Sequence, residues 1–288
     1  MEYNIINTGS DGNAIIINNI IMIDCGVSFA KLKDYYIDLK IIFLTHIHID
    51  HFNKKTIRRL ATERPTLRFA VCSWLVNELI DCGVKKSNID VLEIGKKYEY
   101  GLFDIIPINL YHNVEQCGYR IFIDDKKIIY ATDTNTLDGI TARGYDLFLI
   151  EANYIEEDIK ERILAKKALG IYVYEEDAML NHLSKEKCDL FLLENMSENS
   201  RFEYMHQHRK RKEEEILENI EVLDIYTDSK GNDHVIDEMP NKMIYYAVVK
   251  YGTQALIEKG YSKLTNRFKD IMIKIDVINL MSESIEEE

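Results

Sequence analysis

Four side chains that could bind metal ions lie within six consecutive residues of this chain. They belong to the segment Thr45-His46-Ile47-His48-Ile49-Asp50-His51. His46 and His48 are two residues apart, so in an extended chain their side chains point to the same side. Asp50 and His51 come at the turn that follows and can face a neighbouring position. Imidazole and carboxylate ligands suit Zn²⁺ and Mn²⁺, with zinc the first expectation. The segment predicts ligands for two adjacent metal ions.

A loop with four ligands cannot complete two metal sites, so further ligands are expected at the ends of other elements. His112 follows a predicted strand over 103–110, Asp133 follows a predicted strand over 127–130, and His182 stands in the segment Asn181-His182-Leu183-Ser184. The three other histidines lie in polar sequence and are expected to be exposed and to bind no metal: His206, His208 and His234. Two of them, His206 and His208, lie beside a basic run and could touch a phosphate.

The elements that must position these ligands can be predicted from apolar periodicity and turn residues. The first half of the chain reads as strands joined by tight turns: 3–7, 14–18, 20–23, 41–44, 68–72, 103–110, 120–123, 127–130 and 146–150. Helices are expected over 53–62 and 73–82. From about residue 156 helices dominate, with one more strand expected at Leu190–Leu193 because this run is apolar.

The chain changes character after about residue 200. The basic run Arg209-Lys210-Arg211-Lys212 precedes three glutamates, so i,i+4 pairs on an exposed helix are a better explanation than a phosphate-binding patch. Two amphipathic helices are expected at Met243–Ile257 and Leu264–Leu280. They would dock on the main domain or form the contact of a homodimer. We therefore expect a hydrolase domain over 1–225 and a mainly helical extension over 226–288.

Composition excludes several classes of protein. Hydrophobic residues make up 46% of the chain, which indicates a globular protein. The formal net charge of −13 argues against a protein that coats duplex nucleic acid. No apolar stretch is long enough for a membrane span, and the first residues do not resemble a signal peptide. The five cysteines are scattered and never form a CxxC pair, which indicates reduced thiols in a cytoplasmic protein.

The pattern HxHxDH after a strand, with His112, Asp133 and His182 downstream, resembles the metallo-β-lactamase superfamily. This resemblance implies an α/β fold, an αββα sandwich. Other segments are similar to the YycJ/WalJ group, which lies close to ribonuclease Z and is associated with nuclease or phosphodiester hydrolysis. These segments are 7–14, Ile23-Asp24-Cys25-Gly26, Glu151-Ala152-Asn153 and 181–184. The resemblance covers about residues 3–200.

The resemblance also implies a distribution of the ligands. One metal would be held by His46, His48 and His112. The other would be held by Asp50, His51 and His182, and Asp133 would bridge the two. Asp24 and Glu151 would fix the ligands through hydrogen bonds, although Asp24 could also be only a turn residue at a strand end. Asp50 and His182 would act in catalysis, with Asp50 accepting a hydrogen bond from the attacking water.

One departure from the group concerns phosphate binding. A second His-Leu-Ser segment of the group is replaced here by Asn195-Met196-Ser197, and an asparagine cannot act as a cation or an acid. Candidate phosphate contacts are Ser10, Ser184, Asn195 and Ser197. Ser184 and Ser197 would equally serve as helix N-caps.

The sequence thus predicts a two-metal phosphodiesterase in which a metal-bound hydroxide attacks the phosphodiester bond. A nuclease acting on DNA or RNA is the first hypothesis. The second is a phosphodiesterase for a cyclic or other small nucleotide, which the net charge of −13 and Asn195 favour. The third is a metal-bound binding protein without catalytic activity. The expected partner is the nucleic acid or small nucleotide substrate, and no membrane is expected.

Overall fold

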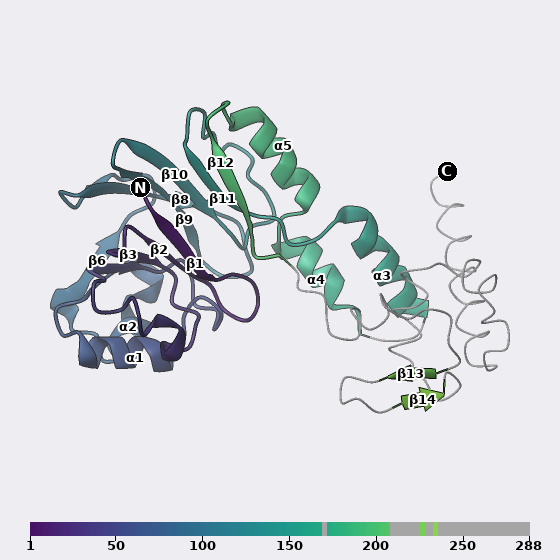
Figure 1. Cartoon of the computed structure of the whole chain (residues 1–288), viewed down its shortest axis with the longest axis horizontal. Coiled ribbons are helices and arrows are strands. Elements are labelled where there is room, and N and C mark those ends of the chain that lie inside the picture. Colours follow the sequence, from purple (N-terminus) through teal and green to yellow (C-terminus); the bar gives the residue numbers. More distant parts are fainter. Residues whose placement is uncertain (169–171, 208–224, 228–232, 236–288) are drawn as a thin grey trace. The chain divides into compact units, whose positions relative to one another are not determined.

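The computed structural model describes residues 1–168, 172–207, 225–227 and 233–235 (Figure 1). It divides into two compact units. The first contains Met1–Ile155 and Met179–His208, and the second contains Glu156–Ala178 and Arg209–Glu288. All candidate metal ligands named above lie in the first unit.

The first unit is built on two six-stranded sheets. The first sheet has the order β1-β2-β3-β4-β5-β6, with bounds Tyr3–Asn7, Ala14–Ile17, Ile21–Ile23, Ile41–Phe43, Arg68–Cys72 and Ile89–Leu92. The second has the order β12-β11-β10-β9-β8-β7. Its strands span Tyr98–Glu99 (β7), Phe103–Asn109 (β8), Cys117–Ile123 (β9), Lys126–Ala131 (β10), Leu147–Glu151 (β11) and Arg201–Met205 (β12). β3, β4, β5 and β6 run parallel to one another, as do β10, β11 and β12, and the other pairs of neighbouring strands are antiparallel.

Five α-helices are assigned in the described part of the chain: α1 (Lys54–Glu63), α2 (Val76–Asp81), α3 (Glu156–Ala168), α4 (Tyr174–Asn181) and α5 (Lys185–Asn195). Three short 3₁₀ helices span Phe29–Leu32, Ser73–Leu75 and Lys86–Asn88. Asn53 begins α1 as its N-cap, because its side-chain oxygen accepts hydrogen bonds from the amides of Lys55 and Thr56.

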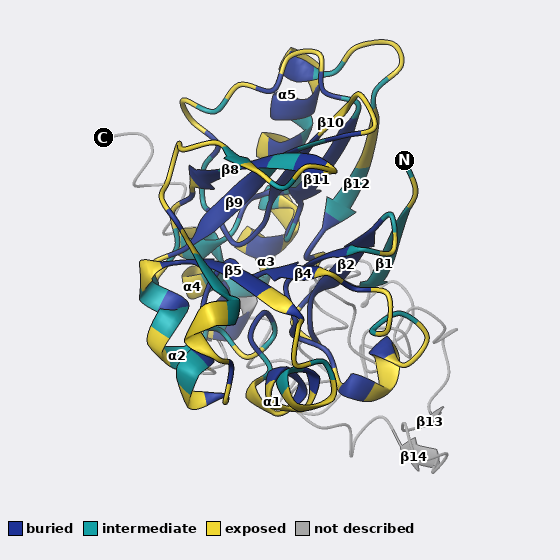
Figure 2. Cartoon of the chain, turned by 90° about the vertical axis from the view of Figure 1, so that its left-hand side faces the viewer, coloured by how far each residue is buried: buried dark blue, intermediate teal, exposed yellow. Residues whose placement is uncertain are grey.

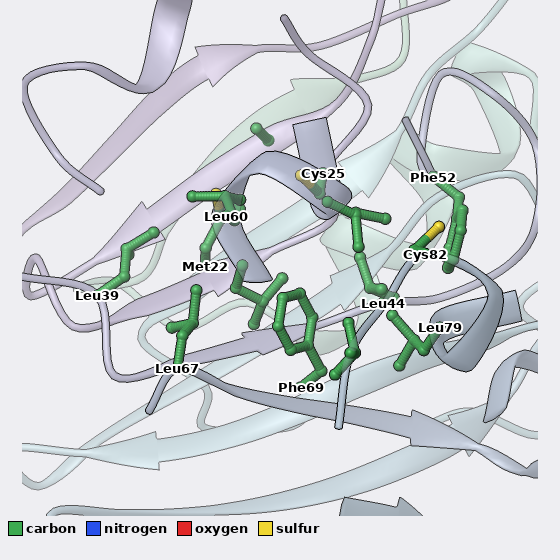
Figure 3. Packing of buried hydrophobic residues seen from close by; sticks show 14 of the residues in the cluster. Met22, Cys25, Leu39, Leu44, Phe52, Leu60, Leu67, Phe69, Leu79 and Cys82 are labelled. Atoms are coloured by element: carbon green, nitrogen blue, oxygen red, sulfur yellow. The ribbon is translucent and has the colours of Figure 1, made fainter. Parts of the chain in front are cut away.

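Three hydrophobic clusters separate four layers of structure. Within β2, Ile16 belongs to the cluster under α1 and α2, whereas Ile15 and Ile17 belong to the cluster between the two sheets, as expected from strand alternation. Figure 2 shows α1 and α2 on one side of the first sheet, and Figure 3 shows Leu60 of α1 and Leu79 of α2 in one cluster with Phe69 of β5. On the far side of the second sheet, Phe148 packs against α5 through Phe191. The layers are therefore helix, sheet, sheet and helix, which confirms the predicted αββα sandwich.

The strand predicted at Leu190–Leu193 was wrong. These residues lie in α5, whose N-cap is Ser184. A short apolar run does not by itself distinguish a strand from a helix that packs on a sheet, and here the packing against Phe148 decided the outcome. The last strand of the second sheet is β12, which is not among the strands predicted from the sequence. β12 pairs in parallel with β11, with Met205 opposite Glu151.

The second unit holds α3, most of α4 and a two-stranded antiparallel hairpin, β13 (Ile225–Thr227) and β14 (Asp233–Val235). Lys166 of α3 and Glu175 of α4 form a buried ion pair. Several predictions lie outside the described residues: the basic run at 209–212, the two amphipathic helices and the position of His208. The domain boundary at residue 226 and the homodimer contact stay predictions.

The five cysteines are buried and form no disulfide bond, as predicted. No helix in the described part of the chain combines the length and the apolar character that crossing a membrane requires.

Candidate metal centre

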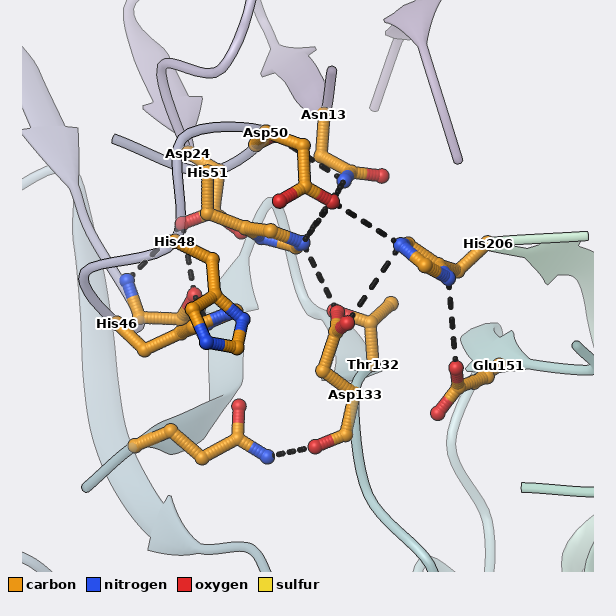
Figure 4. Close-up of polar contacts among 12 residues, drawn as sticks. Asn13, Asp24, His46, His48, Asp50, His51, Thr132, Asp133, Glu151 and His206 are labelled. Atoms are coloured by element: carbon orange, nitrogen blue, oxygen red, sulfur yellow. Dashed lines mark hydrogen bonds and ion pairs between the residues drawn. The ribbon is translucent and has the colours of Figure 1, made fainter. Parts of the chain in front are cut away.

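The candidate ligands converge where strands of both sheets end, and Figure 4 shows six of the converging residues: His46, His48, Asp50, His51, Asp133 and His206. The segment 45–51 follows β4 in the first sheet, and Asp133 and His206 follow β10 and β12 in the second. Asp24, Asp133 and His206 all have positive φ angles, between 56 and 59° for the aspartates and 50° for the histidine. This uncommon backbone conformation, often found at functional sites, turns the chain sharply after each strand.

His46, His48 and His112 form the first group of donors. The Nδ1 atom of His48 lies 3.2 Å from the Nε2 atom of His112. The ring of His46 is 4.7 Å from that of His48 and 5.4 Å from that of His112. These three imidazoles can therefore offer one nitrogen each to a single ion, as the resemblance implied for the same three residues.

The hydrogen bonds of His46 and His112 leave the Nε2 atom of each ring as a lone pair. The hydroxyl of Thr45 donates to Asp24, so it must accept the Nδ1 proton of His46. The Nδ1 atom of His112 lies 2.9 Å from the carbonyl oxygen of Asn181, which can only accept. The Nε2 atom of His46 is buried and has no hydrogen-bond partner among the described residues. An unpartnered buried lone pair is costly unless an ion binds it.

Asp50, His51, Asp133 and His206 form the second group. The Nε2 atom of His51 is 2.9 Å from Asp133 and 3.5 Å from Asp50. The Nε2 atom of His206 is 3.2 Å from Asp50 and 3.5 Å from Asp133. The two groups adjoin, because the rings of His46 and His51 are 4.2 Å apart. Their combined donors fit two neighbouring ions.

His206 is the functional residue that the sequence reasoning missed. The prediction that it is exposed was wrong, since it is 5% exposed and lies inside the second group. Its position follows from the pairing of β12 with β11, which places residue 206 beside Glu151 and Ala152. The available signal was its place at the end of a short alternating segment, Arg201–Met205, which resembles the position of Asp133 after β10.

His182 contacts a different part of the cluster from the one predicted. Its Nδ1 atom lies 2.7 Å from Glu151 and 3.6 Å from Asp133. It shares a third group of donors with Asp133, Glu151 and His206 rather than the group of Asp50 and His51. Its ring stacks on that of His206 at 5.1 Å. The side chain of His182 is 19% exposed, against 7% for His206, so it is the more accessible of the two.

Asp24 and Glu151 are buried carboxylates that hold the ligands in place. Asp24 accepts hydrogen bonds from the backbone and hydroxyl of Thr45, from Nδ1 of His51 and from the hydroxyl of Tyr130. Glu151 accepts bonds from the amides of Thr134 and Leu183 as well as from His182. Contacts of this kind fix ring orientation and proton position in metal sites. The positions predicted for both residues agree with this role.

The pKa values of the cluster reflect burial and the neighbouring carboxylates. Burial lowers the pKa of His46 well below its ordinary value and lowers that of His112 to about 4. In the second group burial acts in the same direction, but the charge of Asp133 and the hydrogen bond to Asp50 raise the pKa of His206 to about 9. The pKa of Asp133 lies well below its usual range because the histidine charges outweigh burial.

The donors present fit a pair of divalent ions. The first group consists of neutral imidazoles that face one another with lone pairs, an arrangement that leaves His46 Nε2 without a partner. The second group combines two imidazoles with two carboxylates, whose charges are balanced by protons on His51 and His206. A divalent ion would replace those protons.

The candidate phosphate contacts do not all reach the cluster. Asn195 is buried, and its amide bonds the backbone of Ala142 and Phe191, so its predicted role toward a phosphate was wrong. Its Nδ2 atom donates to the carbonyl oxygen of Phe191 within α5, and its Oδ1 atom accepts from the amide of Ala142. Ser197 is exposed and bonds Ser200. Ser184 is the buried N-cap of α5, and Ser10 lies exposed in the turn before Asn13.

Comparisons with known proteins agree with this geometry. A family model described as a beta-lactamase superfamily domain matches residues 19–182. The fold is similar to that of the metallo-beta-lactamase fold protein YhfI from Bacillus subtilis, with 16% identity, a TM-score of 0.56 and coverage of 73% of this chain and 86% of that one. The short form of human tRNase Z has 14% identity to this chain and a TM-score of 0.54, and the match covers 73% of this chain and 93% of that one. A diphosphatase from the PhnP family has 14% identity and a TM-score of 0.51, and the match covers 76% of this chain and 91% of that one. No curated protein sequence matched.

Proposed function

This chain belongs to the metallo-β-lactamase superfamily, and we propose that it acts as a two-metal phosphodiesterase. The observation that carries the proposal is that a group of three imidazoles adjoins a second group of imidazoles and carboxylates, which includes the buried Asp133. When bound, a pair of divalent ions would supply a water activated near neutral pH and positive charge for the phosphoryl oxygens. Zinc fits the donor set best, and manganese fits second.

Asp50 is the residue that we assign to aiming the attacking water. Its carboxylate is 17% exposed, whereas that of Asp133 is 2% exposed, so Asp50 is the more accessible of the two. A carboxylate that is both a ligand and a hydrogen-bond acceptor holds a water proton in a fixed direction.

His182 is the residue that we assign to the leaving oxygen. Glu151 lies 2.7 Å from its Nδ1 atom and, against the effect of burial, raises the pKa of His182. An imidazole that carries a proton in this position can give it to the departing alkoxide. His206 then takes the place in the second metal group that the resemblance had implied for His182.

We infer that the first candidate activity is that of a nuclease, with DNA or RNA as its substrate. A two-metal site needs no protein nucleophile to hydrolyse a phosphodiester bond, and DNA and RNA consist of repeated phosphodiester bonds. The short form of tRNase Z, whose fold this chain shares, bears the name of a nuclease.

A small nucleotide is the second candidate, and one observation favours it. In the part of the chain that the structure describes, no lysine or arginine pairs with the carboxylates of the cluster. A polymer backbone needs cations along its path for tight binding, whereas a single phosphodiester needs only the metal pair.

The deciding experiment is a parallel assay of the purified full chain on linear DNA, RNA and cyclic mononucleotides with Zn²⁺ or Mn²⁺. Cleavage of DNA or RNA supports the nuclease. Turnover of cyclic nucleotides alone would leave the small-substrate enzyme. Metal binding without hydrolysis of any substrate would contradict the phosphodiesterase and favour the catalytically silent binding protein.

A further inference from the structure

Asn13 is a buried residue with no place in the ligand set, yet it lies against two candidate ligands (Figure 4). Its Nδ2 atom is 2.8 Å from the Nε2 atom of His51, 3.1 Å from the carbonyl oxygen of Asp50 and 3.4 Å from the Asp50 carboxylate. Its backbone amide donates to the same carbonyl at 2.6 Å. Asn13 thus holds both the backbone and the side chain of Asp50.

The orientation of the Asn13 amide is set by a donor on its other side. The backbone N–H of Gly9 lies 2.9 Å from Oδ1 of Asn13, and an N–H can only donate. The oxygen of the amide is therefore on the Gly9 side, and the NH₂ group faces Asp50 and His51. The NH₂ group donates to the carbonyl and carboxylate oxygens of Asp50, and it also lies 3.2 Å from the carbonyl oxygen of Gly9. Its approach to Nε2 of His51 is a packing contact, because that nitrogen is directed at Asp133 and has no lone pair for a second partner.

Two glycines make this close approach of the backbone possible. A Cβ atom at Gly26 would lie 1.7 Å from the carbonyl oxygen of Asp50 and 2.8 Å from the amide nitrogen of Asn13. A Cβ atom at Gly12 would lie 2.5 Å from the carbonyl oxygen of Gly26. The turn at 9–13, the turn at 24–26 and the metal loop are therefore packed backbone to backbone, which leaves Asn13 no freedom to move away.

The other contacts of the Asp50 carboxylate show how far its position depends on Asn13. Among the described residues, the Asp50 carboxylate contacts only three side chains: His51 and His206, which belong to its own metal group, and Asn13. We propose that Asn13 is a positioning residue for the second metal, and that its amide and backbone N–H hold Asp50 in place among the donors of the second group. This proposal rests on the metal site proposed above.

Asn7 provides a matched control. It is also buried, and its side chain donates to the carbonyl oxygen of Gly12 at 2.6 Å, so it stabilises the same turn. Its Oδ1 atom accepts a hydrogen bond from Nζ of Lys31 at 3.1 Å. A variant at Asn7 therefore weakens the turn and leaves the amide of Asn13 in place.

The test titrates Zn²⁺, and separately Mn²⁺, into chelator-treated full-length protein by calorimetry. Wild type is compared with Asn13→Ala, Asn13→Ser and Asn7→Ala, and each variant is checked by circular dichroism. The serine variant keeps a polar group in the turn, in case the alanine variant fails to fold. We expect both Asn13 variants to bind the second ion about 10- to 100-fold more weakly, with affinity for the first ion unchanged. Asn7→Ala should lower the melting temperature and leave both affinities unchanged.

The outcomes separate this proposal from the function on which it rests. Wild-type protein that binds no metal overturns the metal site and the role of Asn13 with it. Wild-type protein that binds two ions, together with a folded Asn13 variant of equal second-ion affinity, overturns the role of Asn13 alone. Equal weakening of both ions in the Asn13 and Asn7 variants also overturns it, because the effect would then be only that of a loosened turn.

Discussion

At the scale of single residues, His182 and His206 stack on each other but have different hydrogen-bond partners. His206 faces Asp50 and Asp133 with one nitrogen, whereas His182 faces Glu151. Since the carboxylate of Glu151 is fully buried, its charge is stabilised chiefly by these hydrogen bonds. The difference in partners predicts a difference in the effects of their substitution.

His206→Ala should lower the metal content from about two ions per chain to about one, because it removes a donor of the second group. His182→Ala should keep about two ions and lower kcat by about 10²- to 10⁴-fold, the usual contribution of a general acid. Elemental analysis combined with steady-state kinetics measures both effects. Loss of one ion in His182→Ala, with full metal content in His206→Ala, would reverse the two assignments.

One ligand from each group gives a simpler prediction. His112→Ala and Asp50→Ala should each reduce metal-dependent hydrolysis by more than about 100-fold, since even residues that only support a ligand contribute 10- to 100-fold. Hydrolysis rates with saturating metal provide the measurement. Activity within about threefold of wild type in either variant is incompatible with the proposed site.

At the scale of elements, the sheets place the supporting residues as well as the ligands. Tyr130 of β10 donates to Asp24, which in turn fixes His51. Tyr119 of β9, the neighbouring strand, is equally buried, but it donates to the carbonyl oxygen of Leu44. These two tyrosines therefore separate support of the metal site from support of the core.

Tyr130→Phe should weaken metal binding by about 10- to 100-fold, because it removes one of the donors that orient Asp24. Tyr119→Phe should leave metal affinity unchanged and lower the free energy of unfolding by about 1 kcal/mol. Calorimetric titration and chemical denaturation measure the two quantities. Equal metal affinity in Tyr130→Phe and wild type would show that Asp24 does not need this bond.

The start of α5 decides between two roles for Ser184. Its hydroxyl accepts a hydrogen bond from the amide of Lys187, and the residue is fully buried. Ser184→Ala should therefore lower the free energy of unfolding by about 1 kcal/mol and leave KM for the phosphodiester unchanged. A rise in KM without loss of stability would instead indicate a phosphate contact.

At the scale of the whole molecule, part of the net charge of −13 comes from carboxylates concentrated at the candidate metal centre. Four carboxylates, Asp24, Asp50, Asp133 and Glu151, are gathered in one site. Without metal their charge is balanced by protonated histidines, and with metal it is balanced by the ions. Stability and pH are therefore linked through this one region.

The metal-free protein should lose stability as the pH rises from about 7 to 9. The folded-state pKa of His206 is raised to about 9, above the ordinary value near 6.5. Its stabilising contribution is therefore complete below about pH 6.5 and is lost as the pH passes 9. Melting temperatures in excess chelator measure this, and His206→Ala should show a smaller decrease. A melting temperature that rises over this range contradicts the prediction.

Much of this protein could be read from its sequence. The segment 45–51 has a ligand spacing that few other functions require, and alternating apolar residues placed most strands of both sheets. The grouping of His46, His48 and His112 was implied by the resemblance, and the structure brings the same three residues together. The αββα layers followed from the resemblance and are present.

Only the tertiary structure decided which distant histidine joins the second group. His206 meets Asp50 across 156 residues of chain. That contact depends on β12 pairing in parallel with β11, and on Leu190–Leu193 forming a helix rather than a strand. Local sequence carries no information about such pairing, since an apolar run suits either element. The sequence thus determined the chemistry of the donors, whereas strand order in the folded sheet determined their partners.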